Sequence, residues 1–270
     1  AAVALPALLT VLACTEARAQ APSDPASLAA ADSFVVRFET TRGAVDLMVR
    51  REWAPLGAVQ FGLAVADGYY DGAAFFRALR ELCDQHGLLL VFDEVQSGIG
   101  RTGKFFAYEH TGITPDIMAV AKGIGGGFPL GAVLATENAA FGMGAGTHGS
   151  TYGGNPLACA VGSKVMQIVA DDVFLAEVSR KAALLRQGLE SLVAAHPKVF
   201  EAVRGEGLLL GLKCTAINSD IVKAGYQAGI LTVPAADNVI RLLPALNIPD
   251  ADIATALALL EKAAALVEAA

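Results

Sequence analysis

The sequence predicts an α/β fold in which a mainly parallel sheet is followed by a smaller α+β domain. Continuous apolar runs at residues 88–92, 116–121 and 130–136 lack polar alternation, which is typical of strands covered on both faces. Segments with helical spacing of apolar residues precede and follow these runs. The chain has 270 residues, 54% of them hydrophobic and 17% charged, so it can bury a sizeable core and differs from disordered, collagen-like or coiled-coil chains.

The first 21 residues resemble a secretory signal. An apolar run over residues 1–14 precedes a small-x-small site at residues 17–19. The run is too short to span a bilayer core, which needs about 20 helical residues. Two alternatives stay open, an Ala-rich disordered tail and a lipoprotein-type cysteine at Cys14. The signal-like interpretation of residues 1–21 favours export.

Two strands and a helix are predicted next. Residues 33–49 alternate apolar and polar side chains around Thr41, Arg42 and Gly43, which indicates a hairpin with a tight turn. Residues 58–66 show helical spacing of apolar residues. Together they predict a β-β-α segment.

The apolar runs of the sheet end on charged residues. A helix predicted at residues 79–86 and ended by Gly87 leads into the first run, which stops at Asp93 and Glu94. The second run stops at Lys122. Carboxyl ends of neighbouring parallel strands are where α/β proteins bind ligands. The alternative is that these charges only mark the edge of the sheet.

The last third of the chain predicts a small α+β domain. Asn155 is expected to begin a helix, with Pro156 at its first position. The predicted helices cover residues 155–170, 174–195 and 251–269, and the predicted strands cover residues 208–213, 230–233 and 239–243.

Charge and cysteine usage exclude several classes of function. With 20 basic and 27 acidic residues the net charge is −7, which argues against a nucleic-acid or anionic-membrane binder. The four cysteines form no C-x-x-C pair, and the four histidines lack ligand spacing, so no metal site is predicted. Cys83, Cys159 and Cys214 have apolar neighbours and are predicted as small core residues.

A glycine-rich run at residues 98–104, GIGRTGK, partly matches two phosphate-binding motifs. A P-loop would need Ser or Thr after Lys104, where Phe105 stands. The dinucleotide fingerprint would need an acid about 20 residues on, whereas Asp116 comes only 13 residues after Gly103. A simple glycine-rich turn is the preferred interpretation.

Three blocks of the sequence stand out: VFDEVQSGIGRTGKFFAYEH (residues 91–110), PDIMAVAKGIGGGFPLGAVLAT (115–136) and HGSTYGGNPLACA (148–160). Together they closely resemble the class III aminotransferases that use pyridoxal phosphate, and within them the acetylornithine branch. The resemblance covers residues 79–270. It implies part of a fold type I large domain at residues 78–172 and a small C-terminal domain at residues 173–270.

The resemblance assigns roles to two residues at the strand ends. Lys122 would form the Schiff base with the cofactor aldehyde and then move a proton to and from the substrate. A lysine suits this role because an amine can become a nucleophile, which a guanidinium cannot. Asp93 would pair with the pyridine nitrogen and keep it protonated, so that the ring accepts electrons.

The same resemblance assigns the remaining contacts. Val95 would pack on the ring face, and Gln96 would donate a hydrogen bond to the phenolic oxygen. Thr151 would bind the phosphate of a neighbouring subunit, with Ser150 near the substrate. Arg241 would bind the substrate α-carboxylate, for which a planar fork is suited; the alternative is a surface arginine at a strand end.

The expected reaction therefore transfers an amino group from a small-molecule donor such as acetylornithine to the 2-oxo acid 2-oxoglutarate. The cofactor would be pyridoxal 5'-phosphate, and the family implies a homodimer. No membrane span and no nucleic-acid partner are expected. The aminotransferase part favours a cytoplasmic location, in contrast to the signal-like start.

Residues 34–77 resemble instead the start of a cyclophilin-type peptidyl-prolyl isomerase, with Arg77 matching its catalytic arginine. The phosphate loop, ring-stacking aromatic residue and second substrate arginine of the aminotransferase N-terminal half are not found before residue 79. We therefore expect a junction of two incomplete proteins near residues 75–77. The alternatives to a transaminase are an exported isomerase fragment and an inactive chimera.

Overall fold

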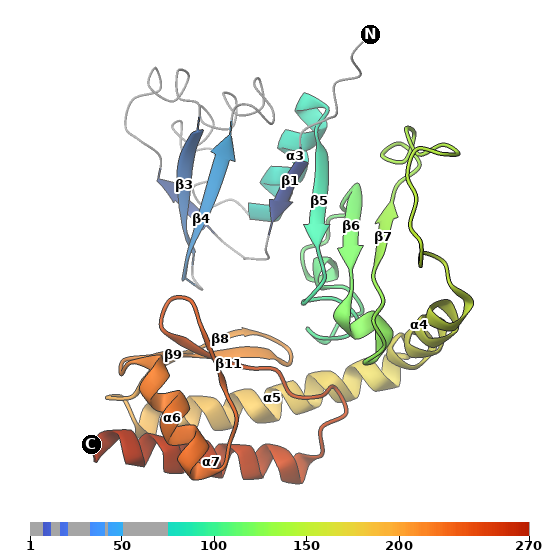
Figure 1. Ribbon diagram of the computed structural model, residues 1–270. Coiled ribbons are helices and arrows are strands. Elements are labelled where there is room, and N and C mark those ends of the chain that lie inside the picture. The colour runs from blue at the N-terminus through green and yellow to red at the C-terminus, as the bar shows by residue number, and fades with distance from the viewer. Residues whose placement is uncertain (1–7, 12–16, 21–32, 41–42, 51–74, 270) are drawn as a thin grey trace. The chain divides into compact units, whose positions relative to one another are not determined.

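The computed structural model describes residues 8–11, 17–20, 33–40, 43–50 and 75–269, with side chains from residue 76 onward (Figure 1). The chain divides into two compact units. The first contains Ala1–Val95 and Tyr108–Cys159, and the second contains Gln96–Ala107 and Ala160–Ala270. Each unit has at least one β-sheet of its own.

The first unit contains the mainly parallel sheet that the sequence predicts. Its strand order is β1-β5-β6-β7; β1, β5 and β6 run parallel, and β7 runs antiparallel to β6. The predicted second and third apolar runs thus form neighbouring strands of opposite direction. The bounds are Leu8–Val11 for β1, Leu89–Asp93 for β5, Ile117–Val120 for β6 and Ala132–Ala135 for β7.

Helix α3, Phe75–His86, packs on β5. The rings of Phe76 and Phe92 meet edge to face with centroids 5.8 Å apart. The helix begins four residues earlier than predicted and ends where expected, because Gly87 adopts a φ of +62° and the Leu88 N–H donates back to the Cys83 carbonyl.

Asp116 ties α3, β5 and β6 together at the amino end of β6. One of its carboxylate oxygens accepts hydrogen bonds from Arg80 Nη1 and from the Leu90 backbone N–H, both at 2.7 Å. Arg80 also pairs with Asp84 at 2.7 Å. These contacts of Asp116 fix β6 beside β5. They therefore help to set which residues of the two strands are neighbours at the opposite, carboxyl end.

Strand β7 differs from the expectation that all three apolar runs are covered on both faces. All four of its residues are exposed, with Val133 at 71% and Leu134 at 43%. The apolar pattern predicted the strand correctly and its burial wrongly. Burial depends on neighbouring layers, and the described part of the chain places none over β7.

A separate three-stranded sheet contains the predicted hairpin strands. It has the order β2-β3-β4, with β2 at Ala17–Gln20, β3 at Ser33–Thr40 and β4 at Gly43–Arg50. β3 and β4 pair antiparallel from Ser33 opposite Arg50 to Thr40 opposite Gly43, as predicted. The turn residues Thr41 and Arg42, the predicted helix at 58–66 and Cys14 lie outside the described residues. β1 and β2 fall within the signal-like segment, and their pairing does not test export.

The second unit combines an antiparallel sheet with helices, as expected for a small α+β domain (Figure 1). Its core is formed by side chains of the sheet and of the helices, among them Leu189, Leu212, Ile240 and Leu260. The sheet has the order β10-β11-β9-β8, with β8 at Phe200–Glu206, β9 at Leu209–Cys214, β10 at Val233–Ala235 and β11 at Val239–Leu242. The helices are α5 at Asp172–Ala195, α6 at Asn218–Ala228 and α7 at Asp250–Glu268.

Two elements of this unit were not predicted, and one strand is displaced. β8 lacks a regular alternation of buried and exposed residues, and α6 contains a glycine, Gly225, that its packing requires. A Cβ at Gly225 would lie 3.2 Å from the Ile230 carbonyl oxygen. The strand predicted at residues 230–233 begins only at Val233.

Helix α4, Pro156–Val169, begins as predicted. The Asn155 side chain accepts a hydrogen bond from the Ala158 N–H at 2.9 Å, which caps the helix and explains the position of Pro156. Cys83 and Cys214 are buried as expected, whereas Cys159 on α4 is exposed, so that prediction was wrong for one cysteine. Its helix presents it away from the packed side.

The glycine-rich run is a packed turn rather than a phosphate loop. No helix begins at Gly103, and the glycines let the turn approach its neighbours closely. A Cβ at Gly100 would lie 2.7 Å from Val169, and one at Gly207 would lie 2.5 Å from the Thr102 backbone. Arg101 donates hydrogen bonds from this turn to the carbonyls of Leu208 and Pro244, and burial lowers its pKa. The preferred sequence interpretation is confirmed, and the two phosphate motifs are excluded.

Within the described residues, no helix has the length and apolarity that crossing a membrane requires. Over the same residues, no three or more His, Cys, Asp or Glu side chains gather where a metal ion could bind.

Candidate functional site

The carboxyl ends of β5 and β6 bring Asp93 and Lys122 to the same edge of the sheet. Asp93 is the last residue of β5 and stands opposite Ala119 in the parallel register. Lys122 comes three residues after Ala119, just beyond the end of β6 at Val120. This is the position at which open α/β sheets bind ligands.

The two consecutive carboxylates at the end of β5 have different environments. Glu94 is only 3% exposed, and its Oε1 accepts a hydrogen bond from the Tyr108 N–H at 2.8 Å. Its own N–H donates to the Ala119 carbonyl at 2.9 Å, which continues the β5–β6 pairing by one residue. Glu94 therefore holds the strand end in place.

Asp93 is exposed, and one of its oxygens, Oδ1, accepts a hydrogen bond from the Val95 N–H at 2.9 Å. Among the described residues, no hydrogen bond or ion pair engages its other oxygen. The backbone contact orients the carboxylate and leaves one oxygen available to a ligand. The sequence singled out both acids but did not foresee that Glu94 takes the structural part.

Lys122 has an unusual backbone conformation. Its φ is +47°, in the left-handed region that disfavours residues with a Cβ. Its side chain is exposed, and its amine makes no hydrogen bond or ion pair within the described part of the chain. Strained residues of this kind persist where a functional demand outweighs the cost. The sequence predicted the importance of Lys122 but not this strain.

The structure places Val95, Ser150 and Thr151 in the same unit. Val95 is half-buried directly after the Asp93 strand end. Ser150 and Thr151 are exposed in the segment between β7 and α4, where the Ser150 hydroxyl accepts a hydrogen bond from Gly153 N–H at 3.0 Å. Neither side chain bonds to Asp93 or Lys122 in the described structure. Of the predicted site residues, the strand ends thus bring together Asp93, Val95 and Lys122 in the described structure.

Gln96 and Arg241 belong to the second unit. Gln96 is half-buried in the turn that follows β5. Arg241 lies on β11 opposite Val233, and its buried Nε has no hydrogen-bond partner among the described residues. A buried N–H donor without a partner costs free energy, which an anion bound to this guanidinium would recover.

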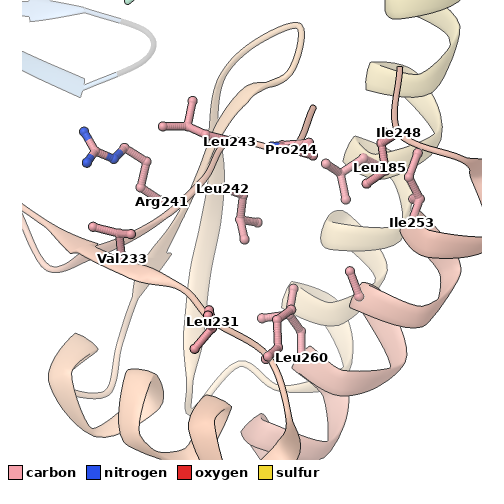
Figure 2. A pocket seen from close by; sticks show the side chains of 12 residues that line it. Leu185, Leu231, Val233, Arg241, Leu242, Leu243, Pro244, Ile248, Ile253 and Leu260 are labelled. Atoms are coloured by element: carbon pink, nitrogen blue, oxygen red, sulfur yellow. The ribbon is translucent and has the colours of Figure 1, made fainter. Parts of the chain in front are cut away.

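Next to Arg241 is an apolar cavity of about 270 Å³, lined by side chains of α5, α7 and the β10–β11 region. Figure 2 shows Leu242 directed toward this cavity and the Arg241 guanidinium directed away from it. Successive residues of a strand face opposite sides, which separates the two side chains. Arg241 therefore extends on the other face of β11, and its Nε has no partner among the described residues.

Comparison with known proteins identifies close relatives. The model of the family "Aminotransferase class-III" matches residues 68–264. The acetylornithine aminotransferase of Rhodobacter capsulatus is 66% identical over 194 residues, which are 72% of this chain and 49% of that protein. That of Mesorhizobium japonicum is 60% identical over 181 residues, 67% of this chain and 45% of that protein.

Solved structures agree with these relatives. The N-acetylornithine aminotransferase from Stenotrophomonas maltophilia has a TM-score of 0.65 at 38% identity, over 75% of this chain and 55% of that one. The chain thus spans about half the length of the curated relatives that it matches.

Proposed function

The chain belongs to the class-III aminotransferases, and we propose that it carries the lysine and aspartate half of an acetylornithine aminotransferase site. Members of this class use pyridoxal 5'-phosphate and move an amino group from an amino donor to a 2-oxo acid. The proposed donor is acetylornithine, the substrate named in the relatives' descriptions, and the proposed acceptor is 2-oxoglutarate.

One observation carries this proposal: a free amine and a free carboxylate oxygen lie at the carboxyl ends of two adjacent parallel strands. Pyridoxal phosphate has an aldehyde, which an amine such as that of Lys122 can bond covalently, and a ring nitrogen, which a carboxylate such as that of Asp93 can keep protonated. Both groups lack a competing protein partner in the described structure. The residues present fit the cofactor.

In the proposed mechanism, Lys122 would hold the cofactor aldehyde until the substrate amine takes its place, which would free the Lys122 amine to act as the base. Its Nζ would then accept the proton from the substrate Cα and return it later to complete the transfer. When bound, the cofactor ring supplies the electron sink that takes up the pair left at Cα. Asp93, oriented by the Val95 N–H, would pair with the ring nitrogen and stabilise its protonated form.

Other residues would bind and orient. The unpartnered guanidinium of Arg241 supports binding of the substrate α-carboxylate, since a fork of N–H donors matches a planar anion. Val95 would cover the ring, and Gln96 would donate to its phenolic oxygen. Ser150 would lie near the substrate, and Thr151 would bind the phosphate of a second subunit. The exposure of Ser150 and Thr151 agrees with a role toward a partner in a homodimer.

Cofactor attachment can be tested directly. The purified chain is incubated with pyridoxal phosphate, reduced with borohydride and digested, and the modified peptides are measured by mass spectrometry. We expect the pyridoxyl group on Lys122 and its loss in Lys122→Ala. Lys164→Ala, which removes an exposed lysine of α4, is the matched control and should leave the label unchanged. Equal labelling of Lys122 and Lys164 would contradict the proposal.

Isomerase activity of residues 34–77 is the less favoured alternative. Arg77 lies exposed in the first turn of α3, the helix that packs on β5 through Phe76. The aminotransferase match begins at residue 68 and so includes Arg77. We expect no proline-peptide isomerisation, and any activity that Arg77→Ala abolishes would revive the cyclophilin interpretation.

A further inference from the structure

Arg101, in the glycine-rich turn at residues 98–104, is bonded to two other segments of the second unit. Its Nη1 donates hydrogen bonds to the carbonyls of Pro244 at 2.5 Å and of Leu208 at 3.4 Å, and its own carbonyl accepts from the Leu208 N–H at 3.0 Å. Leu208 lies in the turn between β8 and β9, and Pro244 comes two residues after the end of β11. One residue thus connects three segments that are far apart in the sequence.

No carboxylate pairs with the Arg101 guanidinium in the described part of the chain. The side chain is half-buried, and this burial lowers its pKa. Removing a cation from water costs free energy unless other groups replace the lost hydration. The two backbone carbonyls do so, and Nη1 offers each of them one N–H in the fixed plane of the guanidinium. An ammonium group has no such plane, so these two contacts explain why the residue is an arginine.

The segment at residues 243–248, which follows β11, has one other backbone hydrogen bond among the described residues. It is local, from the Ile248 N–H to the Ala245 carbonyl at 3.1 Å. The bond from Arg101 to Pro244 is therefore the hydrogen bond that ties this segment to another part of the unit. It fixes the chain just beyond the end of β11.

Arg241 lies three residues before Pro244, next to the end of β11 at Leu242 (Figure 2). Its backbone is held in the sheet between Val233 and Gly211. Its side chain makes no hydrogen bond or ion pair with the described residues, and its buried Nε has no partner there. The direction of the guanidinium is therefore set by the backbone at this end of the strand, and not by polar contacts of its own.

We propose that Arg101 is a positioning residue for Arg241: by fixing Pro244, it sets the direction in which the Arg241 guanidinium meets a substrate carboxylate. Arg101 itself does not touch the substrate. A fork of donors has to match both oxygens of a planar anion, so a small shift of the strand end weakens binding. The inference rests on the carboxylate-binding role proposed for Arg241, and it does not require cofactor attachment to Lys122.

The experiment titrates the full chain with acetylornithine in the absence of pyridoxal phosphate. The Kd is measured from the broadening of the acetyl methyl signal in NMR spectra, and the site is observed through ¹⁵N labels at the arginine Nε atoms. The Arg241 signal, identified by its loss in Arg241→Lys, should shift on titration. In Arg101→Lys we expect a smaller shift and a Kd about tenfold higher, the effect of losing one hydrogen bond of the fork.

Arg186→Lys is the matched control, because Arg186 Nη2 donates to the Gly205 carbonyl at 2.5 Å and makes the same kind of contact in the same unit. It should lower Tm to a similar extent and leave the Kd within about twofold of the unmodified chain. Adding Arg101→Lys to Arg241→Lys should weaken binding no further, since the effect acts through Arg241. If Arg101→Lys fails to fold, Arg101→Gln keeps an N–H donor without a charge to bury and takes its place.

Three results would overturn the inference. One is an unchanged Kd in Arg101→Lys when Arg241→Lys abolishes binding. Another is an equal loss of affinity in Arg101→Lys and Arg186→Lys, which would assign the effect to general stability. The third is the failure of acetylornithine to shift the Arg241 signal, which would also refute the proposed role of Arg241. A chain that shows the expected Kd values and still fails to attach pyridoxal phosphate at Lys122 would refute the proposed cofactor site only.

Discussion

Replacing Lys122 by glycine is expected to stabilise the chain while abolishing cofactor attachment. Lys122 has a φ of +47°, and its exposed side chain makes no hydrogen bond or ion pair among the described residues. Removing the side chain therefore loses no polar contact. It relieves the close approach of Cβ to the backbone that makes left-handed conformations unfavourable for other residues.

The size of the effect follows from two opposing free energies. The left-handed conformation costs a residue with a Cβ about 1–2 kcal/mol. Glycine loses about 0.5–1 kcal/mol more conformational entropy on folding. The net gain in the free energy of unfolding is about 0.5–1 kcal/mol, which for a domain of this size raises Tm by about 1–4 °C. Lys122→Ala keeps the Cβ and should leave the stability roughly unchanged.

Urea unfolding followed by circular dichroism compares Lys122→Gly with Lys122→Ala, since both lack the amine. Gly127→Ala, in the same turn, makes the opposite change, because it adds a Cβ at a residue with positive φ and should lower the stability. Gly127 has a φ of +109°, and a Cβ placed there would have no neighbouring atom within 4 Å, so any loss of stability reflects backbone conformation alone. The reasoning is refuted if Lys122→Gly is no more stable than Lys122→Ala. A gain would show that the strain at Lys122 is kept for chemistry rather than for folding.

Three further predictions concern packing within the two units. Asp116→Ala should lower the free energy of unfolding by about 2–4 kcal/mol, because it leaves the largely buried Arg80 and the Leu90 N–H without their shared partner; Asp84→Ala, at an exposed carboxylate, should change it by less than about 0.5 kcal/mol in the same urea titration. Asn238→Ala should cost about 2–3 kcal/mol, since the side chain donates to the Cys214 and Ala216 carbonyls and accepts from the Asn218 N–H; unchanged thermal unfolding would contradict this. Burial raises the pKa of both Cys83 and Cys214 to about 11, from 9.0 for a free thiol. Below pH 9 both thiols are protonated in the folded and the unfolded chain, and the free energy of unfolding is at its full value. As the pH rises from 9 to 11 the unfolded chain loses these protons first, so the free energy of unfolding falls. In a Cys14→Ser background at about pH 8, a thiol reagent should therefore modify exposed Cys159 quickly and Cys83 and Cys214 only on unfolding; rapid modification of all three would show that Cys83 and Cys214 are not buried.

Local sequence patterns predicted many elements because the cause lies within a few residues. Gly87 ends α3 since glycine adopts its φ of +62° without a Cβ penalty, and Asn155 caps α4 with its own side chain. Apolar runs located β5 and β6, and the charges that end them located Asp93 and Lys122. Parallel pairing alone then places those two residues at one edge.

Features that depend on distant partners were missed. The exposure of β7 and of Cys159 depends on which other elements pack over them, and this cannot be inferred from the residue type. Glu94 and Asp93 are adjacent acids, but only the fold supplies the Tyr108 N–H that engages one and leaves the other free. The glycine-rich run was predicted as a simple turn, but only the fold shows that Gly100 packs against Val169 and that the backbone at Thr102 meets Gly207.

The sequence by itself indicated the family, through the resemblance of its three blocks, and it predicted the central strands and helices and the two strand-end residues of the proposed site, because motifs and periodicity are local properties of the chain. Only the tertiary structure decided which of those residues are free to bind. Within the described part of the chain it engages Glu94, leaves the amine of Lys122 unpaired on a strained backbone, and leaves all four residues of β7 exposed. The physical reason is that desolvation, hydrogen-bond satisfaction and strain are set by groups that meet only when the chain has folded.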